Sequence, residues 1–312
     1  MSENETAPGA EPLRFGLIGV DSPHAPSFAR LLGDGRTGAV RGAQVALAWR
    51  GVAAQDFPLA RDRIDDLAAD VSARGVAWCS SPEEVAERCD AVLVVASDAR
   101  THPDYFHRVA GFGKPVYVDT RFALTTADAR AMLDAARDSG ALALAGSPKR
   151  FTPELRDAAS PGVPVERIDL VGPLPTQPGH PVLDWYGVHL VDLAVAVMGP
   201  GCVRVDARAD GPVTLTWEDG RVATLDGEPQ WSPTTRGAIR TADGRRRDLV
   251  IHAGEPMLTG LLEALVAACR TGVPTVPPAE VLTVVAVVEA ARASRLRGEP
   301  VRVDPQPQQS RS

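Results

Sequence analysis

The sequence predicts an α/β protein with an N-terminal doubly wound parallel sheet and a C-terminal α+β domain whose sheet is mostly antiparallel. Two observations carry this prediction. Over roughly the first 145 residues, short apolar runs alternate with helical patterns, as expected for strands that pair in parallel. After Phe151, strand pairs joined by Asp-Gly turns replace that alternation. A chain of 312 residues is long enough for two such domains.

In the N-terminal part, apolar runs bounded by polar turns predict the strands, and amphipathic periodicity predicts the helices. The clearest helix begins at Thr126, a good N-cap residue, and ends before Gly140. The expected strands are residues 13–20, 44–49, 91–96, 115–118 and 141–145, and the expected helices are 27–32, 102–110 and 126–139.

In the C-terminal part, the turns Asp219-Gly220 and Asp243-Gly244 predict two hairpins. A helix is expected to end at the Gly-Pro-Gly segment 199–201. The expected strands are residues 165–171, 203–207, 213–217, 221–225, 239–241 and 248–251, and the expected helices are 187–198, 257–270 and 279–295.

Composition argues against several classes of partner. The net charge of −7, with no long basic run, argues against nucleic acid and anionic membrane. No apolar run reaches the ~18 residues of a membrane helix, and the N-terminus lacks the apolar core of a signal peptide, so a cytoplasmic location is expected. The four cysteines form no C-x-x-C pair, so neither a metal site nor a disulfide framework is predicted.

The segment Gly19-Val20-Asp21-Ser22-Pro23-His24 follows the first strand, where a dinucleotide fingerprint would read G-x-G-x-x-G. Gly19 keeps the tight turn, but Asp21 and His24 replace the second and third glycines. A carboxylate ~4 Å from a phosphate oxygen costs about 4 kcal/mol at an effective dielectric constant of about 20, so weak cofactor binding is expected. Alternatively, Asp21 caps the following helix and His24 packs against it.

The second strand ends in Trp49-Arg50, where an NAD enzyme usually has an acidic residue for the ribose. An arginine there could bind a 2′-phosphate, which favours NADP over NAD. Trp49 could stack on an adenine. The alternative is an ordinary exposed arginine that follows a buried tryptophan.

Residues 113–125, GKPVYVDTRFALT, resemble the GK-x-V-x-x-E-K-P-x-A-x-T signature of the glucose–fructose oxidoreductase, inositol dehydrogenase and MocA family. In that family the lysine of E-K-P lies beside the nicotinamide and helps to transfer the substrate proton. Here the three positions are Asp119, Thr120 and Arg121. The resemblance implies an NAD(P)-dependent oxidoreductase for a sugar, cyclitol or related polyol or ketone, without that lysine.

Further segments follow the order and spacing of the same family, so the resemblance spans residues 13–304. On the cofactor side, it places Ser97, His102 and Asp119 beside the expected dinucleotide. The matching segments are Ser97-Asp98 through His102, in register with T-P-x-x-x-H; 146–153, similar to R-F-x-P; 184–192, similar to G-x-H-x-x-D; and 297–303, similar to G-x-P-V.

His189 and Asp192 are the main candidates for acid–base chemistry. They stand three residues apart, so they share one face of the expected helix. A histidine near a helix N-terminus favours its neutral form, which can accept a proton from an alcohol. In the family such a pair contacts the reacting hydroxyl. The alternative is a core histidine with Asp192 as a helix brace.

Three more residues are assigned to the catalytic site. Thr120 cannot replace a lysine as a charged proton donor. Arg121 stays protonated near neutral pH, so it could orient a hydroxyl, carboxylate or phosphate, or form a surface salt bridge. Lys149, one of only two lysines, lies where the chain passes into the second domain.

These expectations define the domains and leave three functions open. A Rossmann-type domain is expected at residues 13–122 and a substrate and dimerisation domain at 123–304, with disordered tails at 1–12 and 305–312. The chain is an NAD(P)-dependent oxidoreductase, a non-redox enzyme using Asp21, His24, His189 and Asp192 as acid–base groups, or a non-catalytic subunit. A small-molecule substrate is expected. The sheet of the second domain predicts a homodimer or higher homo-oligomer, because one face needs cover.

Overall fold

A computed structural model describes residues 11–159, 163–208 and 211–303. Of the two expected disordered tails, residues 1–12 and 305–312, all but residues 11 and 12 lie outside the described residues. The chain forms two compact units: unit 1 contains Met1–Asp119, Met132–Ala145 and Leu258–Thr275, and unit 2 contains Thr120–Ala131, Gly146–Met257 and Val276–Ser312. The expected division of the sequence after residue 122 stays a prediction.

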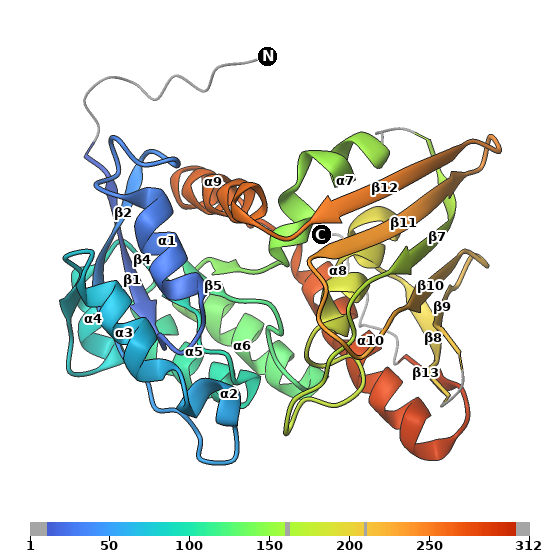
Figure 1. Ribbon diagram of the computed structural model, residues 1–312, viewed down its shortest axis with the longest axis horizontal. Helices are drawn as coiled ribbons and strands as arrows, with labels where there is room; N and C mark the ends of the chain where they lie inside the picture. The colour runs from blue at the N-terminus through green and yellow to red at the C-terminus, as the bar shows by residue number, and fades with distance from the viewer. Residues whose placement is uncertain (1–10, 160–162, 209–210, 304–312) are drawn as a thin grey trace. The chain divides into compact units, whose positions relative to one another are not determined.

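Unit 1 is built on a six-stranded sheet in the order β3-β2-β1-β4-β5-β6, with every pair parallel. This is the strand order of a doubly wound dinucleotide-binding fold, which confirms the predicted class. Helices α1 and α3 lie on one side of the sheet, and α4 and α5 on the other (Figure 1). The strands are β1 (Leu13–Ile18), β2 (Ala43–Trp49), β3 (Ala77–Trp78), β4 (Ala91–Val94), β5 (Val116–Val118) and β6 (Ala143–Leu144).

The helices of unit 1 match the prediction where capping signals were clear. Helix α5 (His102–Ala110) and helix α6 (Thr126–Ser139), which runs from unit 2 into unit 1, have the expected bounds. The segment between β2 and β4 was not predicted, although Pro58 and Pro82 occupy first helical positions and Ser81 caps the N–H of Glu84. The other helices are α1 (His24–Leu32), α2 (Pro58–Arg61), α3 (Ile64–Ser72), α4 (Pro82–Arg88) and α9 (Glu255–Thr271).

Lys114, within the motif that resembles the oxidoreductase signature, has a structural role. Its Nζ donates hydrogen bonds to the carbonyl oxygens of Ala86, Glu87 and Cys89, at 2.6, 2.9 and 2.6 Å. These carbonyls lie at the C-terminal end of α4, where a cation is favoured by the helix dipole. The lysine therefore ties the loop before β5 to α4.

Unit 2 contains a seven-stranded sheet in the order β12-β11-β7-β10-β9-β8-β13. Only β7 and β10 pair in parallel, so the predicted mostly antiparallel sheet is confirmed. Both predicted hairpins form, and the second is longer than expected because Arg and Asp side chains hide its strand pattern. The strands are β7 (Val165–Val171), β8 (Cys202–Asp206), β9 (Val213–Trp217), β10 (Val222–Asp226), β11 (Thr234–Thr241), β12 (Arg246–His252) and β13 (Val301–Arg302).

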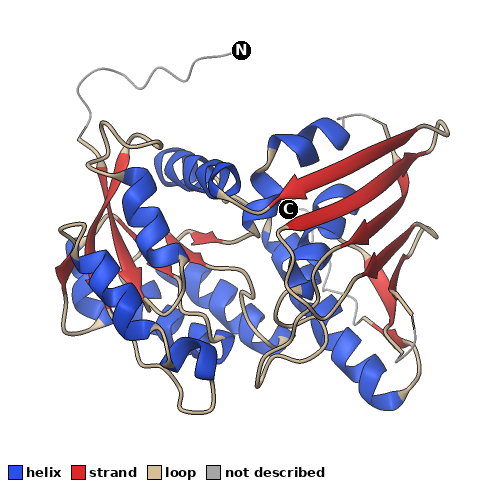
Figure 2. Cartoon of the chain, in the orientation of Figure 1, coloured by secondary structure: helices blue, strands red, loops and turns tan. Residues whose placement is uncertain are grey.

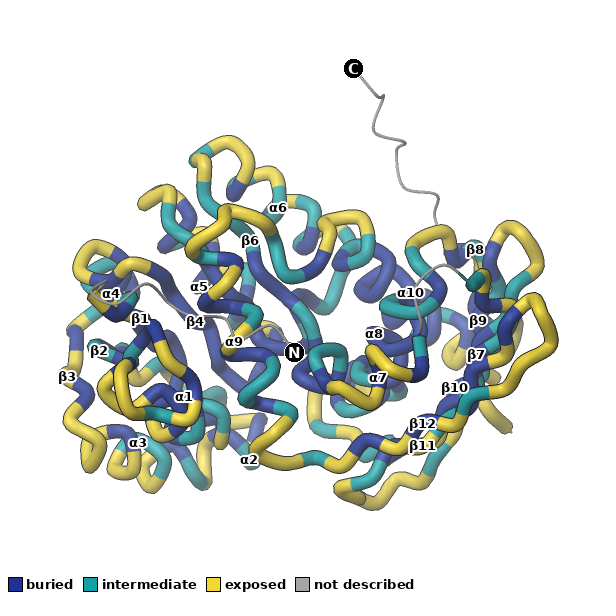
Figure 3. Tube along the Cα trace, turned by 90° about the horizontal axis from the view of Figure 1, so that it is seen from above, coloured by how far each residue is buried: buried dark blue, intermediate teal, exposed yellow. Residues whose placement is uncertain are grey.

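Helices cover one face of this sheet within the described residues, and the other face carries none (Figure 2). Along β11 and β12, buried and exposed residues alternate, as Figure 3 shows. The covering elements are the 3₁₀-helix η2 (Pro148–Phe151), α7 (Pro153–Ala158), α8 (Gly187–Met198) and α10 (Pro278–Arg297). None of the helices in the described ranges combines the length and the apolar character needed to cross a bilayer.

Helix α8 is the central helix of unit 2. Its apolar residues are buried on almost every side, as expected for a helix enclosed by a core. His189 and Asp192 are its only polar side chains. Each therefore needs a specific partner, and those partners define one half of the candidate site.

Candidate functional site

The carboxyl edge of the parallel sheet in unit 1 begins with a tight turn after β1. Gly19 has a φ of +74°, and a Cβ placed there would lie 2.7 Å from the Cβ of Ala96. Only glycine fits this turn without displacing the end of β4. The first position of the expected fingerprint therefore keeps its geometry, at the edge where doubly wound sheets bind ligands.

Asp21 joins the loops that follow β1 and β4. Its Oδ1 accepts the N–H of Ser97 at 3.1 Å, and the Ser97 hydroxyl donates to the Asp21 carbonyl at 3.1 Å. Arg63 donates from Nε to that carbonyl and from Nη2 to Ser97 Oγ, both at 2.8 Å. We call these three residues the Asp21 clasp.

Burial raises the pKa of the Asp21 carboxyl, while the Ser97 N–H opposes that rise. Its carboxylate is buried and directed to the Ser97 N–H, which holds it at the loop that follows β4. The alternative expectation that Asp21 caps α1 is wrong. The N-cap position is Pro23, and the side chain that accepts an N–H at this helix end is Ser22, whose hydroxyl accepts that of His24 at 3.3 Å.

His24 pairs with Asp119, which follows β5. Its Nδ1 lies 2.5 Å from Asp119 Oδ2, and the buried hydroxyl of Tyr117 donates to Asp119 Oδ1 at 3.0 Å. The imidazole stacks on Phe28 at 5.4 Å between ring centroids. Asp119 is buried, whereas the His24 side chain is 23% exposed. A buried carboxylate thus orients an imidazole that reaches the surface.

The residues expected at the ribose have partners of their own. Arg50 pairs through Nη2 with Asp65 Oδ1, and both side chains are at least 49% exposed. An exposed pair of this kind is weak and leaves the guanidinium available to a ligand. The Trp49 ring meets Tyr105 edge to face at 5.1 Å, and the Arg108 guanidinium lies 5.4 Å from it, so α5 covers part of this ring.

His102 lies in the core at the start of α5. Its Nε2 is 2.8 Å from the carbonyl oxygen of Ala96, so it fixes the end of β4. Ser97 is likewise buried in the Asp21 clasp. Both residues shape the edge of the sheet, and their direct contact with a cofactor stays a prediction.

The residues of unit 1 fit a dinucleotide with a weakened pyrophosphate site. The Gly19 turn has the geometry expected beside the phosphates. Arg50 lies at the end of β2, where the ribose is expected. The first turn of α1 supplies few donors, because Pro23 and Pro26 have no N–H. The N–H of His24 and of Ala25 are directed to the hydroxyl and the carbonyl oxygen of Ser22.

In unit 2, Arg150 of η2 holds Asp192 of α8. Its Nε and Nη2 donate to the two carboxylate oxygens at 3.0 and 3.2 Å, and its Nη1 donates to Glu280 of α10 at 2.5 Å. Asp192 Oδ2 also accepts the N–H of Ser147 at 3.2 Å. Both oxygens of this buried carboxylate are therefore engaged, which gives Asp192 the geometry of a brace.

His189 is positioned by Ser147. Its Nδ1 lies 2.7 Å from the buried Ser147 hydroxyl, and the Tyr186 ring lies 5.4 Å from the imidazole. The Ser147 hydroxyl also accepts the N–H of Lys149 at 3.3 Å. The imidazole thus has the neutral Ser147 hydroxyl at Nδ1, and the Ser147 N–H links the same residue to Asp192.

Lys149 is buried two residues further along. Its Nζ donates to the Thr235 hydroxyl of β11 at 2.6 Å. Burial lowers the pKa of this ammonium to about 8. Buried lysines with a shifted pKa are typical of functional sites. Burying the charged ammonium lowers the stability of the folded protein.

Arg121 has a left-handed backbone, with φ of 74°. Its guanidinium lies 4.2 Å from the centre of the Trp185 ring, and Nη1 donates to the Trp185 carbonyl at 3.3 Å. A non-glycine residue in this conformation is strained and is often found at functional sites. Thr120 beside it is buried.

Asp184, at the start of segment 184–192, is a buried carboxylate to which the sequence assigned no role. It pairs with Arg292, whose Nη2 donates to the carbonyl of Leu124 at 2.6 Å. The second oxygen, Oδ2, has no hydrogen-bond partner among the described residues. Burial raises the pKa of Asp184 to about 7, against the opposing effect of Arg292.

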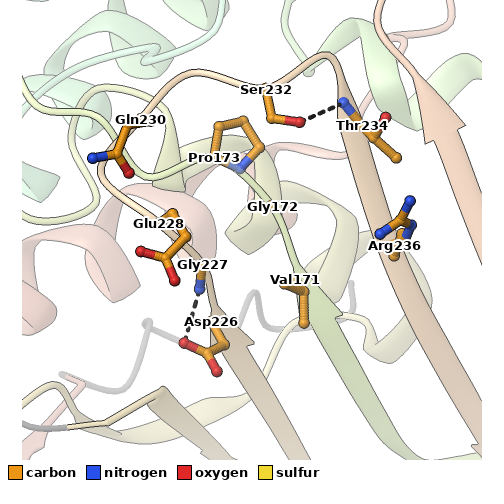
Figure 4. A pocket seen from close by; sticks show the side chains of 10 residues that line it. All are labelled: Val171, Gly172, Pro173, Asp226, Gly227, Glu228, Gln230, Ser232, Thr234 and Arg236. Carbon is orange, nitrogen blue, oxygen red and sulfur yellow. Dashed lines mark hydrogen bonds between the residues drawn. The ribbon is translucent and has the colours of Figure 1, made fainter.

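A hollow of about 290 Å³ lies at the ends of β7 and β10 in unit 2 (Figure 4). Its polar side chains include Asp226, Glu228 and Arg236, and Asp226 Oδ1 accepts the N–H of Gly227 at 2.8 Å. None of the residues predicted for the site lines it. It is therefore distinct from the groups around α8.

The sequence missed the residues that hold the predicted ones. Ser147 and Arg150 flank Lys149 in a segment chosen only for its similarity to R-F-x-P. Tyr117 lies in a buried strand, and a buried tyrosine hydroxyl indicates that a polar partner is near. Arg63 belongs to the unpredicted region between β2 and β4.

The sequence matches no protein-family model, and no curated protein matches it. The fold is that of known dehydrogenases. GenD2 from gentamicin A biosynthesis, solved in complex with NAD, is 18% identical with a TM-score of 0.75, covering 95% of this chain and 97% of its own. A myo-inositol dehydrogenase from Corynebacterium glutamicum is 16% identical with a TM-score of 0.73, covering 95% and 100%.

An oxidoreductase from Agrobacterium radiobacter, solved with NAD+, L-tartaric acid and magnesium, is 14% identical with a TM-score of 0.69, covering 94% and 99%. At these identities the comparisons establish the fold over nearly the whole chain. The resemblance to the inositol dehydrogenase family is thus confirmed at the level of the fold.

We predict that Lys149→Met raises the thermal midpoint at pH 7, because it removes a destabilised ammonium. The unfolded lysine keeps its proton to about pH 10.4 and the folded one only to about pH 8. Between these two pH values the unfolded wild type binds more protons than the folded one, so the stability of the wild type rises with pH. The stability difference between Lys149→Met and the wild type therefore shrinks over this range. Below pH 8 the advantage is constant, at about 1–3 kcal/mol after loss of the Thr235 hydrogen bond.

The thermal midpoints of both proteins are measured from pH 6.5 to 10.5. Lys114→Met is the matched control, and it should destabilise the protein because three carbonyl oxygens lose their donor. An advantage of Lys149→Met that does not change with pH would contradict the prediction.

Proposed function

We propose that the protein is an NAD(P)-dependent oxidoreductase that acts on a sugar, a cyclitol or a related polyol or ketone. The observation that carries the proposal is the oriented imidazole of His189, within a fold that solved dehydrogenases share over nearly the whole chain. Two of the similar structures contain NAD or NAD+, and others are inositol dehydrogenases.

The proposed roles follow from the contacts of each residue. The Gly19 turn and Arg50 would hold the dinucleotide, which supplies a hydride acceptor when bound. His189 forms a hydrogen bond with the reacting hydroxyl and draws its proton, because a neutral imidazole is a base near neutral pH. Asp192 and Ser147 keep that imidazole in place.

Arg121, Lys149 and Thr120 complete the proposed site. Arg121, held against Trp185, orients an oxygen of the substrate. Lys149 has a pKa of about 8, so part of it is neutral near physiological pH and it can take part in proton transfer. Thr120 occupies the place of the family's lysine without its charge.

The main alternative is a non-redox enzyme on the same scaffold, and it is favoured by Thr120 and by the few donors at the start of α1. A non-catalytic subunit is the third possibility. Binding of a nicotinamide cofactor by the purified protein separates the first function from both others.

We predict weak binding of the cofactor with a preference for NADPH, because Arg50 can bind a 2′-phosphate. NADPH and NADH are titrated by fluorescence against the wild type and Arg50→Ala, with the exposed Arg74→Ala as a control. Arg50→Ala should weaken NADPH by about tenfold and NADH little. Equal losses for both nucleotides would remove the 2′-phosphate role, and no binding of either by the wild type would refute the oxidoreductase.

We predict that His189→Asn lowers kcat by ~10²–10⁴, since a general base contributes that much to a rate. The thermal midpoint should move little, because the ring is half-buried and asparagine keeps a polar group beside the Ser147 hydroxyl. Oxidation of inositols and hexoses is followed by NAD(P)H absorbance. His252→Asn, at an exposed histidine on β12, is the matched control. Retained activity, or loss by unfolding alone, would make His189 a core histidine.

We further propose a cytoplasmic homodimer or higher homo-oligomer. Free cysteines at positions 79, 89, 202 and 269 fit a reducing compartment. The uncovered face of the sheet in unit 2 exposes Val171 and Val250, at 51% and 42%, beside charges of both signs such as Arg236 and Asp248. Such a mixed face can be complementary to a second copy of itself.

Light scattering at micromolar concentration should therefore give at least a dimer. The double variant Val171→Asp and Val250→Asp should shift the population towards monomer, because it buries like charges at the proposed contact. Val52→Asp, at a 73% exposed valine of unit 1, should have no effect. A wild type that is strictly monomeric would contradict the proposal.

A further inference from the structure

Trp231 is an exposed tryptophan on the loop 227–233, which joins β10 to β11 in unit 2. It is 57% exposed, the largest fraction among the five tryptophans of the chain. Its neighbours Gln230 and Ser232 line the hollow at the ends of β7 and β10 (Figure 4). Trp231 contacts the start of α8 instead, where its Nε1 donates to the Tyr186 hydroxyl at 2.8 Å. The loop therefore presents this indole beside the helix that carries His189.

The indole of Trp231 is held at its edge and open on its faces. The hydrogen bond to Tyr186 fixes the direction of the ring. Among the described residues, no aromatic ring or guanidinium stacks on it. Leaving so large an apolar ring in water forgoes the stabilisation that burial would bring. A fixed and uncovered aromatic face of this kind is suited to contact with a ligand.

Tyr186 connects the indole to the candidate base. Its ring lies 5.4 Å from the His189 imidazole, with 56° between the ring planes. Its hydroxyl accepts the indole N–H, so one residue touches both side chains. All three residues belong to unit 2. We call Trp231 and Tyr186 the aromatic platform.

The backbone around Trp185, which precedes Tyr186, is strained. Within the described ranges, the non-glycine residues with positive φ are Arg121, at 74°, and Val182, at 55°. Such a φ is a clear outlier for a β-branched residue such as Val182, which lies four positions before Tyr186. Arg121 stacks on the Trp185 ring at 4.2 Å. Strain of this kind clusters at active sites and ligand clamps, so it independently supports a ligand site at the start of α8.

An open aromatic face selects for ligands that have an apolar face of their own. A six-membered ring with mostly equatorial hydroxyls turns C–H groups to both faces, whereas an open-chain polyol presents hydroxyls on every side. The indole face is negative, and it therefore attracts the weakly positive hydrogens of C–H groups. Stacking also removes apolar surface from water. The aromatic platform should therefore bind a ring in preference to a chain with the same number of hydroxyls.

We propose that Trp231 is a specificity-determining residue that stacks on the face of a cyclic polyol bound beside His189. This inference rests on the proposed oxidation of a polyol, and it narrows the substrate to ring compounds, a cyclitol or a pyranose. Tyr186 is a positioning residue, because it holds the indole edge while the ligand covers the indole face.

The first measurement needs no turnover. Tryptophan emission of the full-length protein is followed during titration with myo-inositol, alone and with NAD+ or NADP+ present. Stacking should displace water from the exposed indole and move the emission towards shorter wavelength. Trp231→Phe should abolish that shift. Trp78→Phe is the matched control and should keep it, because Trp78 is 39% exposed and hydrogen-bonded to Ser72, but lies in unit 1.

D-glucitol, an open-chain polyol with as many hydroxyls as myo-inositol, is titrated in parallel and should give no shift. A wild type that shows no shift with myo-inositol under any of these conditions would overturn the aromatic platform. An equal shift with D-glucitol, or a shift that persists in Trp231→Phe, would overturn it as well.

The second measurement is steady-state oxidation of myo-inositol, followed by NAD(P)H absorbance. Trp231→Ala should raise KM about tenfold and leave kcat within about twofold, because the lost contact is made equally by bound substrate and transition state. Trp231→Phe keeps a flat ring and should recover most of the loss. The thermal midpoint of both variants should stay near that of the wild type, since the side chain is exposed.

The outcomes separate this inference from the proposed function. A wild type that shows the ring-specific shift but reduces neither NAD+ nor NADP+ would refute the oxidation and keep the platform. A wild type that oxidises myo-inositol with a KM unaffected by Trp231→Ala would refute the platform and keep the oxidation. If Trp231→Ala changes the oligomeric state in light scattering and leaves myo-inositol binding intact, the indole is a contact between copies, and the proposal is wrong.

Discussion

The ion pair between Arg150 and Asp192 is the interaction on which the functional half of unit 2 depends. Asp192 lies on a helix that is otherwise almost wholly buried among apolar side chains. A carboxylate in such a position is tolerated only with a charged and hydrogen-bonded partner. Arg150 supplies both, and it also reaches Glu280, so one guanidinium joins η2, α8 and α10.

The position of His189 follows from this pair. Because Arg150 fixes η2 against α8, the N–H of Ser147 meets Asp192 and its hydroxyl meets His189. Lys149 extends from the same short segment to Thr235 of β11. Residues 147–150 thus hold the imidazole, the brace and the buried ammonium in one arrangement.

In unit 1, side chains occupy positions where a glycine-rich loop would present bare backbone. The Asp21 clasp joins the loops after β1 and β4, and His24 joins the start of α1 to the end of β5. These bonds order the edge of the sheet before any ligand arrives, which lowers the conformational entropy that binding must remove. Their cost is the loss of backbone donors that a pyrophosphate would use.

The sequence predicted most of the fold because the signals for its elements are local. Helix α8 has the expected bounds, since apolar periodicity runs unbroken to Gly199. The region between β2 and β4 was missed because β3 has only two residues, both exposed, and α2 is a single turn. The spacing of His189 and Asp192 could be read as one helical face, but their partners lie 42 residues or more away in the chain. The direction of the Asp21 carboxylate likewise depends on Ser97, 76 residues distant.

The two lysines show why a motif alone does not carry chemistry. Lys114 belongs to the segment that most resembles a dehydrogenase signature, yet three carbonyl oxygens hold its ammonium as the cap of a helix. Lys149 lies in a weaker motif, but its ammonium is buried against one hydroxyl and its pKa falls to about 8. Proton transfer near neutral pH needs a group whose charge is not already fixed by strong partners. Because Thr120 carries no charge, the proposed proton-transfer groups are Lys149 and the imidazole of His189, each defined by its surroundings rather than by its place in a motif.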